Sequence, residues 1–337
     1  MNVQCLRSFE ENFVVFDQNN SISTAWVIEH PSHAHIVFSW LNQKKSSNDF
    51  IFATDRPEIR NLLDTMSLYG IETIWLPRPG GDISRFQKLW RAIVRMRLVE
   101  KRLRNVTPIV SRIICINSPL EIRSAAKVGI RERILALDVE VDHITQRIAA
   151  KYATQLILPD SWRSELAIRK LSSMDHLNIP SPWTHVHLKT QKNIQRDGIL
   201  VRRLNGKGTH DKSEIVDINP LLELGLQIEY IWNEDDFLEH PWNGPIFSRR
   251  FNGVISQSVT VAIEAALNSS PVLLASKAKR GVIDDLIARG APIWIWTGPK
   301  DNLQFEEWKK ALKNEIYWSD SLGSEIRSQW ETILNLK

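Results

Sequence analysis

The feature that most constrains this chain is a regular alternation of short β-branched or aromatic runs with longer segments of helical period. In the first half the runs lie at residues 25–28, 50–54, 73–76, 109–116, 133–137 and 155–158. Strands that alternate with helices form parallel sheets, because each return to the sheet needs a crossover. The pattern therefore predicts an α/β protein built from doubly wound parallel sheets.

The same alternation restarts in the second half, with runs at residues 198–204, 227–232, 245–248, 271–275 and 292–296. The stretch between the two series is rich in His, Asn, Gln, Lys and Pro and follows neither period. A chain of 337 residues also exceeds the usual size of one hydrophobic core. We therefore predict two Rossmann-like domains that face a central cleft. The predicted segments are an N-terminal extension at 1–23, a first domain at 24–172, a linker at 173–197, a second domain at 198–315 and a C-terminal packing helix at 316–337.

The composition excludes several classes of protein. With 43% hydrophobic and 24% charged residues, the chain has the make-up of a globular protein rather than of a disordered one. The formal net charge of +4 is too weak to predict a nucleic-acid partner, although it suits a cleft that binds phosphate groups. Cys5 and Cys115 are far apart and lack a metal-ligand spacing, which is typical of a reducing compartment. Because no secretory leader and no apolar run of ~18 residues is visible, we expect a cytoplasmic location.

Three histidines follow the first predicted strand, where it runs into a helix. They are His30, His33 and His35. Such junctions are where α/β proteins place function. An imidazole there can bind a sugar hydroxyl or a phosphate, and we take His33 or His35 as the candidate general base. The alternative is that they are capping and surface histidines.

The pair His33 and His35 also suggests a metal site, because some barrel hydrolases begin one with His-x-His. Further ligands would have to come from scattered residues such as His143, His176 or Asp211, and no spacing singles these out. We therefore predict no metal site.

A second candidate is the loop after the first strand of the second domain. Gly206 and Gly208 permit a tight turn whose N–H groups can face a diphosphate. Arg202, Arg203 and Lys207 add positive charge. The loop ends in His210 and Asp211. The alternative is a solvated turn, since a lone Gly-x-Gly is weak evidence.

A third candidate is the start of an Ala-rich helix near residue 259. The hydroxyls of Ser258 and Thr260, together with free amides of the first turn, can hold phosphate. Glu264 lies about one turn further on, where a carboxylate can accept hydrogen bonds from both hydroxyls of a ribose. The alternative is a solvated helix glutamate.

A basic helix is predicted from residue 85 to residue 104, where eight Lys and Arg side chains stand against Glu100 alone. Its apolar residues Phe86, Leu89, Trp90 and Ile93 share helical spacing, so we expect one face to pack and the others to carry charge. The charged faces are either solvated or contact anionic lipid or a polyanionic acceptor, which would place the protein peripherally at the inner membrane face.

Five segments carry a resemblance to a known family. They are residues 30–35, 118–121 with 125–130, 137–143, 202–211 and 260–271. In this order, across about residues 24–300, they resemble an uncharacterised, largely archaeal family, the domain of unknown function 354 of the GT-B glycosyltransferase and UDP-GlcNAc 2-epimerase superfamily. The resemblance adds further candidates for the cleft: His30, Ser118, Asp138, Glu140 and His143.

The resemblance implies a first domain that binds an acceptor and a second that binds a nucleotide-sugar. It makes Glu264 similar to the ribose-binding glutamate of related UDP-sugar enzymes. The family usually has a Gly-rich turn before this helix, whereas this chain has Ser258, Val259 and Thr260, and Gln257 replaces an acidic residue. A β-branched Val where Gly is usual narrows the approach to a pyrophosphate.

The expected function is metal-independent transfer of a sugar from a nucleotide diphosphate-sugar to an unknown glycan or lipid-linked acceptor. The nucleotide-sugar is then a substrate, and no cofactor is expected. Arg202 or Arg203 and helix N-termini would stabilise the leaving diphosphate. One alternative is a sugar-nucleotide epimerase in which Asp138, Glu140 or Asp142 assists proton abstraction. Another is a non-catalytic binding protein that keeps the fold.

Overall fold

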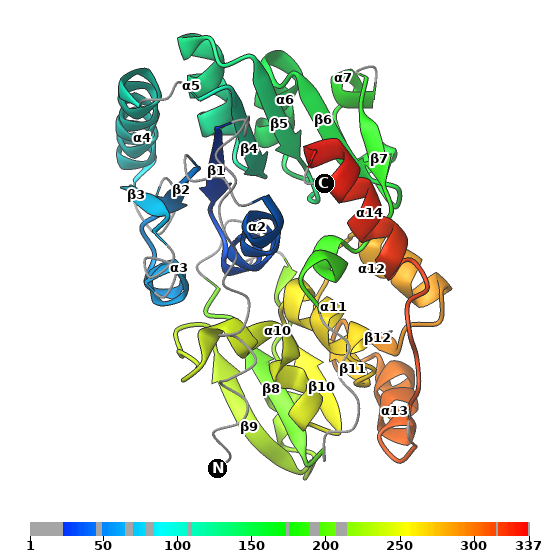
Figure 1. The fold of residues 1–337 in the computed structure, drawn as a ribbon. Coiled ribbons are helices and arrows are strands. Elements are labelled where there is room, and N and C mark those ends of the chain that lie inside the picture. The colour runs from blue at the N-terminus through cyan, green and yellow to red at the C-terminus, as the bar shows by residue number, and fades with distance from the viewer. Residues whose placement is uncertain are drawn as a thin grey trace.

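The computed structural model describes residues 23–44, 49–64, 70–78, 84–106, 110–172, 175–188, 196–206, 214–314 and 316–335. Two wholly parallel sheets, one above the other in Figure 1, are each covered by helices. The predicted extension lies outside the described residues, apart from Ser23.

The first sheet has seven strands in the order β3-β2-β1-β4-β5-β6-β7. The strands are β1 (Thr24–Ile28), β2 (Phe50–Thr54), β3 (Glu72–Leu76), β4 (Arg112–Ile116), β5 (Glu132–Ala136), β6 (Gln155–Pro159) and β7 (Leu177–Ile179). The helices around it are α2 (Pro31–Lys44), α3 (Pro57–Leu63), α4 (Arg85–Asn105), α5 (Pro119–Val128), α6 (His143–Tyr152) and α7 (Arg169–Ser172), with the 3₁₀ turns η2 (Ser164–Leu166) and η3 (Trp183–Val186).

The second sheet has five strands in the order β12-β11-β10-β8-β9. The strands are β8 (Ile199–Arg203), β9 (Ile228–Asn233), β10 (Gly253–Ser256), β11 (Val272–Leu274) and β12 (Ile293–Ile295). Its helices are α9 (Asn219–Leu222), α10 (Gly244–Phe247), α11 (Val259–Leu267), α12 (Gly281–Ala288) and α13 (Asn302–Ala311), with the 3₁₀ turns η4 (Pro241–Asn243) and η5 (Ser248–Arg250).

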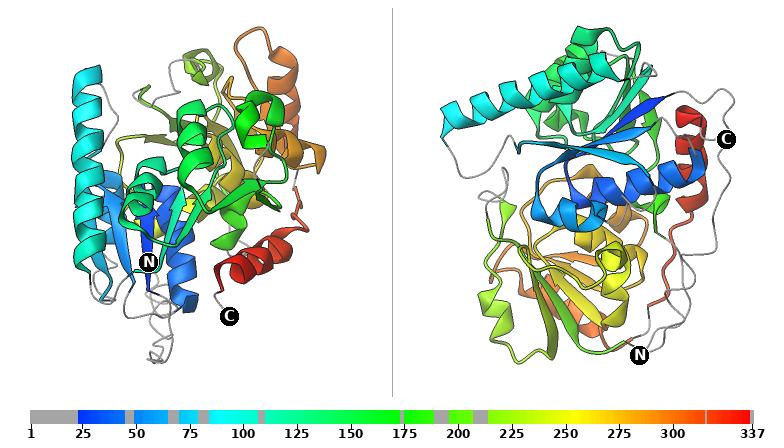
Figure 2. Two further views of the ribbon diagram at one scale, coloured as in Figure 1. Left: turned by 90° about the horizontal axis from the view of Figure 1, so that it is seen from above. Right: turned by 60° about the vertical axis from the view of Figure 1, so that its left-hand side comes forward.

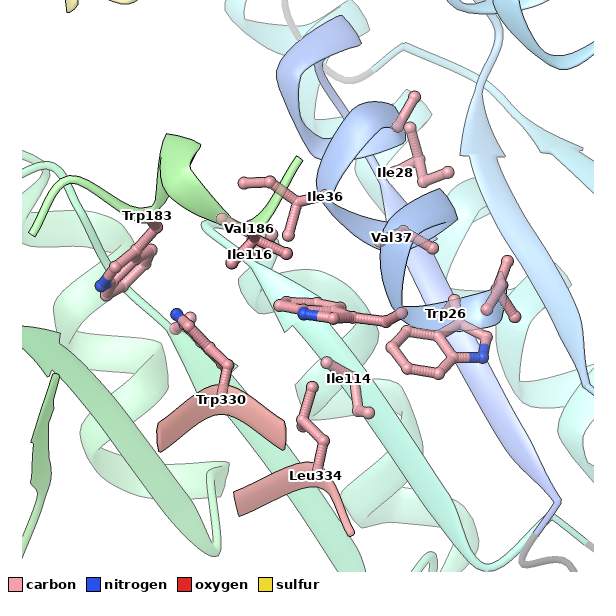
Figure 3. Close-up of a cluster of buried hydrophobic side chains, with 14 of the residues drawn as sticks. Trp26, Ile28, Ile36, Val37, Ile114, Ile116, Trp183, Val186, Trp330 and Leu334 are labelled. Atoms are coloured by element: carbon pink, nitrogen blue, oxygen red, sulfur yellow. The ribbon is translucent and has the colours of Figure 1, made fainter. Parts of the chain in front are cut away.

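The central strands of both sheets are buried on both faces, as expected for parallel sheets, whereas the edge strands β3 and β9 are partly exposed. In β1 the side chains alternate: Trp26 and Ile28 enter one apolar cluster, while Ala25 and Val27 enter the cluster on the other face. Figure 3 shows the first of these clusters. In it the ring centroid of Trp40 lies 5.7 Å from that of Trp26 and 4.9 Å from that of Trp330 on the C-terminal helix. Trp330 packs edge-on against another indole, Trp183, at 5.2 Å between ring centroids. Most tryptophans in the described residues are thus packing residues.

The last helix, α14 (Gly323–Leu334), returns from the second domain to the first (Figure 1). Its apolar positions Ile326, Trp330 and Leu334 are buried there, as the helical spacing predicts. The carbonyl of Leu334 accepts a hydrogen bond of 2.7 Å from Arg112 on β4. The C-terminal segment therefore helps to hold the first domain together.

Two sequence-based assignments differ from the structure. The predicted linker contains β7 and η3, because Ile179, Trp183 and Val186 find buried places against the first sheet. The predicted strand at 245–248 is helical, since Pro245 occupies the start of α10 and lacks the N–H that a central strand needs. The central strand of that region is β10, which begins at Gly253.

The prediction for the basic helix was also wrong in part. Phe86, Leu89 and Trp90 are 76%, 60% and 57% exposed, although we expected them to pack. The buried face of α4 is formed further along by Arg95, Val99 and Leu103, which lie four residues apart. The first turns extend past the helix's neighbours, as Figure 2 (right) shows for the cyan end of α4.

None of the helices in the described segments combines the length and the apolar character that crossing a bilayer requires.

The topology fixes where ligands can bind. In the first sheet the strand order reverses between β1 and β4, and in the second between β8 and β10. In doubly wound sheets, ligands bind outside the carboxyl ends of the strands at such reversals. Glu29 and Asn117 follow β1 and β4, while Arg203 and Gln257 stand at the ends of β8 and β10. Both reversals open towards the space between the domains.

Candidate functional site

Two adjoining cavities of about 160 and 380 Å³ lie between the domains. They share three lining residues: His30, Ser32 and Thr260. The larger cavity alone falls within the ~300–1,000 Å³ of typical small-molecule sites. We call the smaller one, on the side of β8 and β9, the first cavity, and the larger one, on the side of β4 to β6, the second cavity.

The first cavity has an aromatic wall at the carboxyl ends of β8 and β9. The guanidinium of Arg202 stacks on the ring of Trp232 at 4.2 Å and donates to the carbonyl of Asn233 at 2.7 Å. Its Nε has no partner among the described residues, and burial lowers its pKa. Phe237, 53% exposed, lines the same cavity. A flat, partly apolar ring system would find both stacking surface and hydrogen-bond donors here.

The N-terminus of α11 forms the floor of this cavity. Ser258 caps the helix, with its hydroxyl accepting from the Val261 amide at 3.4 Å. The amides of Val259 and Thr260 are in the first turn, which offers no internal acceptor, and no described residue accepts from them. Thr260 lines both cavities and Val259 lines the second, so these two donors, with the hydroxyls of Ser258 and Thr260, are available to an anionic group at the border of the cavities.

Glu264 lies one turn into α11 and faces the first cavity with 6% of its surface exposed. Burial raises the pKa of its carboxyl to about 8, and the nearby Arg202 lowers it only in part. No described residue donates a side-chain hydrogen bond to this carboxyl. The closest ring nitrogen is Nε2 of His187, 4.0 Å from Oε1, which is too far for a hydrogen bond. The carboxyl is therefore free to accept from a ligand.

The first domain contributes two groups to the same cavity. Arg56, just after β2, has a side chain that is 16% exposed and a buried Nε without a partner in the described residues. The ring of His30 reaches the surface but lies deep in the concave space between the domains. Desolvation there, followed by the charges of Arg56 and Arg202, lowers the pKa of His30 to about 4. Both guanidiniums thus lie near His30 and would attract a diphosphate. They share the cavity with Glu58, which lies 3.5 Å from Arg56, and with Glu234 and Asp236.

His35, which lines the first cavity, and His187, which lines the second, form a buried pair between them. Their rings stack at 5.4 Å between centroids, and His35 meets the ring of Trp242 edge-on at 5.1 Å. Desolvation lowers the pKa of His35 to about 3 and that of His187 well below its usual value. Both nitrogens of His187 lack a partner among the described residues. Both rings are neutral near pH 7 and can exchange hydrogen bonds without carrying charge.

The second cavity has a buried acidic network at its base. Arg95 of α4, fully buried, lies 2.8 Å from Oε1 of Glu29 and also binds Glu121 and, at 2.8 Å, Thr54. Two carboxyls therefore share one cation. Desolvation raises the pKa of Glu29 to about 7, with Arg95 opposing and Glu121 adding to the rise. Of the two acids only Glu29 lines the cavity, because Glu121 is fully buried.

His33 lines the second cavity and not the first. Its Nδ1 accepts from the Glu29 amide at 3.5 Å, and desolvation lowers its pKa well below the usual value. Residues two apart on a helix point in different directions, so His33 and His35 face different cavities. They do not converge on one ion. Among the described residues no group of three or more His, Cys, Asp or Glu side chains is arranged to hold a metal.

Asp138 and Glu140, both predicted for the cleft, line the second cavity. Asp138 is bound by the Asn117 side-chain amide, and desolvation raises its pKa. Glu140 is 1% exposed and accepts from the amide of Gly281, on α12, at 2.9 Å. A side chain at Gly281 would place its Cβ 1.8 Å from the carbonyl oxygen of Ser161, so the domains meet here through a glycine. Glu140 is thus engaged in joining the domains.

The other predicted residues have local roles or cannot be placed. Ser118 is fully buried and donates to the Ile116 carbonyl at 3.0 Å, and it also contacts Glu29. His143 is exposed at the start of α6, contacts the Leu166 carbonyl and lines neither cavity. Asp142 caps the same helix through the Thr145 amide.

Within the predicted phosphate loop, only the beginning can be described. Gly206 has a left-handed backbone, with φ of 73°, as a tight turn requires. Arg203 points away from the first cavity and binds Asn219 at 2.8 Å, which leaves Arg202 as the cleft-lining arginine of this pair. The remaining predicted residues of this loop, Lys207, Gly208, His210 and Asp211, lie outside the described residues.

Several residues of the site were missed from the sequence. These are Glu29, Arg56, Arg95, His187, Trp232 and Phe237. Glu29 directly follows a predicted strand, Arg56 lies two residues after one, and Trp232 ends one, so their positions at strand ends were a usable signal. Arg95 and His187 carried no such signal, because their places depend on how distant elements pack.

No protein-family model and no curated protein matches the sequence. Solved structures resemble the fold. The S. aureus MnaA–UDP complex has a TM-score of 0.59 at 10% identity, covering 94% of this chain and 98% of that one. For UDP-GlcNAc 2-epimerase from Methanocaldococcus jannaschii the TM-score is 0.57 at 11% identity, with coverages of 93% and 99%. For Arabidopsis thaliana UGT89C1 complexed with UDP it is 0.51 at 10% identity, with coverages of 90% and 100%.

These likenesses confirm the predicted fold. The chain has two Rossmann-like domains in the GT-B-like arrangement of glycosyltransferases and UDP-GlcNAc 2-epimerases.

Proposed function

We propose that the chain is a nucleotide-sugar enzyme that transfers a sugar from a nucleotide diphosphate donor to an acceptor. The observation that carries this proposal is the first cavity, which combines stacking surface, converging guanidiniums, a helix N-terminus and an unpaired carboxyl. Solved neighbours of the fold include proteins bound to UDP. We also propose that the chain is related to the domain of unknown function 354, which its sequence resembles.

The nucleoside diphosphate part of the donor would lie along the first cavity, and its sugar would extend towards the larger second cavity. Its base would stack against Trp232 or Phe237, and its ribose hydroxyls would donate to Glu264. Its diphosphate would meet the amides of Val259 and Thr260 at the border of the two cavities, with Arg56 and Arg202 on the side of the first. The neutral state of Glu264 near pH 7 suits this position, because a second negative charge beside a diphosphate would be repelled.

The sugar and the acceptor would meet at the border of the two cavities, beside His30 and Thr260. We assign the general base to Glu29, because a base works best when its pKa is near the working pH. His33 and His35, the bases first considered, are weaker because their pKa values are lowered. We assign them the positioning of hydroxyl groups. The role of Arg202 and of α11 would be to stabilise the leaving diphosphate.

One observation favours the epimerase alternative. Glu29 and Asp138 line the same cavity, and the pKa of each is raised, so two carboxyls could exchange protons with one sugar. An epimerase would use such a pair without an acceptor. A non-catalytic protein would need neither carboxyl.

Product analysis tests the proposal. The protein is incubated with sugar conjugates of UDP, GDP, CDP and dTDP, with and without glycan and polyprenyl-phosphate acceptors, and the products are resolved by anion exchange and mass spectrometry. Transfer predicts release of the nucleoside diphosphate together with a gain of one sugar mass on an acceptor. An isomerised sugar in the absence of acceptor would establish the epimerase, and binding without any product would leave a binding protein.

A further inference from the structure

The projecting part of α4 exposes an apolar surface that the proposed catalytic function does not explain. Phe86, Leu89 and Trp90 fall within five residues and are each more than half exposed. Isolated exposed apolar side chains are common, but a group of this kind marks a contact surface. Ser84 and Gln87 form a reciprocal cap at the helix start, so the exposed turns are regular helix rather than a frayed end.

Unpaired positive charges surround this surface. Lys88, Arg91, Arg97 and Lys101 are exposed, and none has an acidic partner among the described residues. The only acid of the helix, Glu100, is 8% exposed and is occupied by Lys127 at 2.9 Å. Phe86, Trp90, Arg97 and Lys101 lie along one side of the helix, since the spacings of four, seven and four residues are near whole turns.

We propose that the projecting part of α4 docks the protein on an anionic phospholipid surface. Aromatic rings at the level of the headgroups, with basic side chains beside them, are the pattern by which amphipathic helices bind such surfaces. A soluble polyanion would use the charges but would leave Phe86, Leu89 and Trp90 in water. The combination of exposed apolar and unpaired basic side chains therefore favours lipid.

The position of the helix gives this contact a consequence. α4 follows β3, so its first turn lies at the carboxyl-end edge of the first sheet, the same edge at which Glu29 enters the second cavity. Arg95, further along α4, touches Glu29 directly. Docking through the first turns would thus bring the cleft near the headgroups. The inference does not rest on the proposed transferase activity, since a membrane-bound protein of another function would dock equally.

Vesicle flotation of the full chain tests the proposal. The vesicles contain phosphatidylcholine alone or phosphatidylcholine with phosphatidylglycerol, and the expected result is binding to the second kind only, weakened by salt. F86S/W90S should reduce binding more than about tenfold, because each ring loses apolar burial. R97E/K101E should also weaken vesicle binding. Each basic side chain near an anionic surface contributes about 1 kcal/mol, so we expect at least an about fivefold loss of binding for each altered charge.

Matched controls lie on α13. Leu303 is 69% exposed and Lys310 is exposed, so L303S, which removes one exposed apolar side chain, and K310E, which reverses one exposed charge, make changes of the same kind far from α4 and should bind as the unaltered protein does. Circular dichroism checks that every variant is folded. The proposal is overturned if neither vesicle binds, if the two vesicles bind equally, if F86S/W90S leaves binding unchanged, or if only soluble polyphosphate binds. Loss of a dimer in F86S/W90S, without vesicle binding in the parent protein, would mark a subunit interface instead.

Discussion

The two walls of the cleft hold their functional groups in different ways. On the wall of the first domain, Glu29 is fixed by Arg95, which also binds Glu121 and Thr54. On the wall of the second domain, Glu264 has no side-chain hydrogen bond from a described residue, and Nε of Arg202 has no partner there. The pKa of each glutamate is raised, to about 7 and to about 8, but only the first is held by a cation in contact.

This difference indicates a division of labour. A preassembled network suits a group that must keep its pKa and position through a reaction. Unpaired groups suit ligand binding, because the ligand supplies the missing partners and gains affinity from doing so. We therefore expect changes in the first wall to affect stability and rate, and changes in the second wall to affect affinity.

The largest effect on stability should come from Arg95→Met. It removes a fully buried cation and leaves Glu29 and Glu121 without their shared partner, for which we expect a loss of about 3–5 kcal/mol in the free energy of unfolding. Urea denaturation measures this. Arg202→Met is the matched change on the other wall and should cost far less stability. Equal losses of stability in the two variants would contradict the proposed difference between the two walls of the cleft.

Glu29→Gln should lower kcat/KM by about 10²–10⁴ while leaving nucleotide affinity within a few-fold. A base must be ionised, so activity of the unaltered protein should fall as pH drops through about 7, the pKa of Glu29. The variant should lack this limb of the pH profile. If the limb persists in the variant, another group is the base, and Asp138→Asn would be the next substitution, because desolvation raises the pKa of that carboxyl too.

Glu264→Gln should stabilise the free protein at neutral pH. The pKa of the folded carboxyl, about 8, exceeds the ordinary value of 4.5, so the folded state holds a proton that the unfolded state releases. Stability is therefore lost as pH rises from about 4.5 towards 8, by roughly 3 kcal/mol at pH 7 as an upper estimate. Thermal unfolding at pH 5 and pH 7.5 measures this: the difference in Tm between the two pH values should be larger for the unaltered protein than for Glu264→Gln. Parallel pH curves would mean that the carboxyl is ionised in the fold.

The smallest effect should come from Phe237→Ala, on the rim of the first cavity. Stacking of a base on an aromatic ring contributes about 1–3 kcal/mol, so nucleotide affinity should fall by roughly tenfold with little change in stability. Calorimetric titration measures it. Tyr317→Ala removes a ring that is 86% exposed and lines neither cavity, and it should change nothing. If Tyr317→Ala weakens nucleotide binding and Phe237→Ala does not, the nucleobase does not bind against Phe237.

The architecture could be predicted from the sequence because each buried parallel strand is a short, mainly apolar run that can be recognised without knowing its neighbours. Runs such as residues 50–54 are apolar up to the final Thr54, and β2 occupies those residues. The same local rule failed at 245–248, where an apolar stretch with a proline became α10. The three-residue strand β7 was hidden in a polar stretch, because only its contacts with β6 make it a strand.

The candidate site could be predicted only where it is carried by strand ends. His30, Ser258 and Thr260 line the cleft, since each lies just after a strand at a reversal of the sheet order. Glu264 lines it too, but it lies within α11, and it was singled out by the family resemblance. The network around Arg95 could not be predicted, because helical period alone does not say which side of a long basic helix a sheet will cover. The exposure of Phe86 escaped prediction for the same reason.

The most direct test of the central claim is isothermal titration calorimetry with UDP, GDP, CDP and dTDP. The account predicts that at least one of them binds at a single site, that Glu264→Ala and Arg202→Met weaken this binding at least tenfold, and that Glu306→Gln, an exposed change on α13, does not. If no nucleotide binds, or if binding survives both substitutions unchanged, the first cavity is not a nucleotide site and the proposed function is wrong.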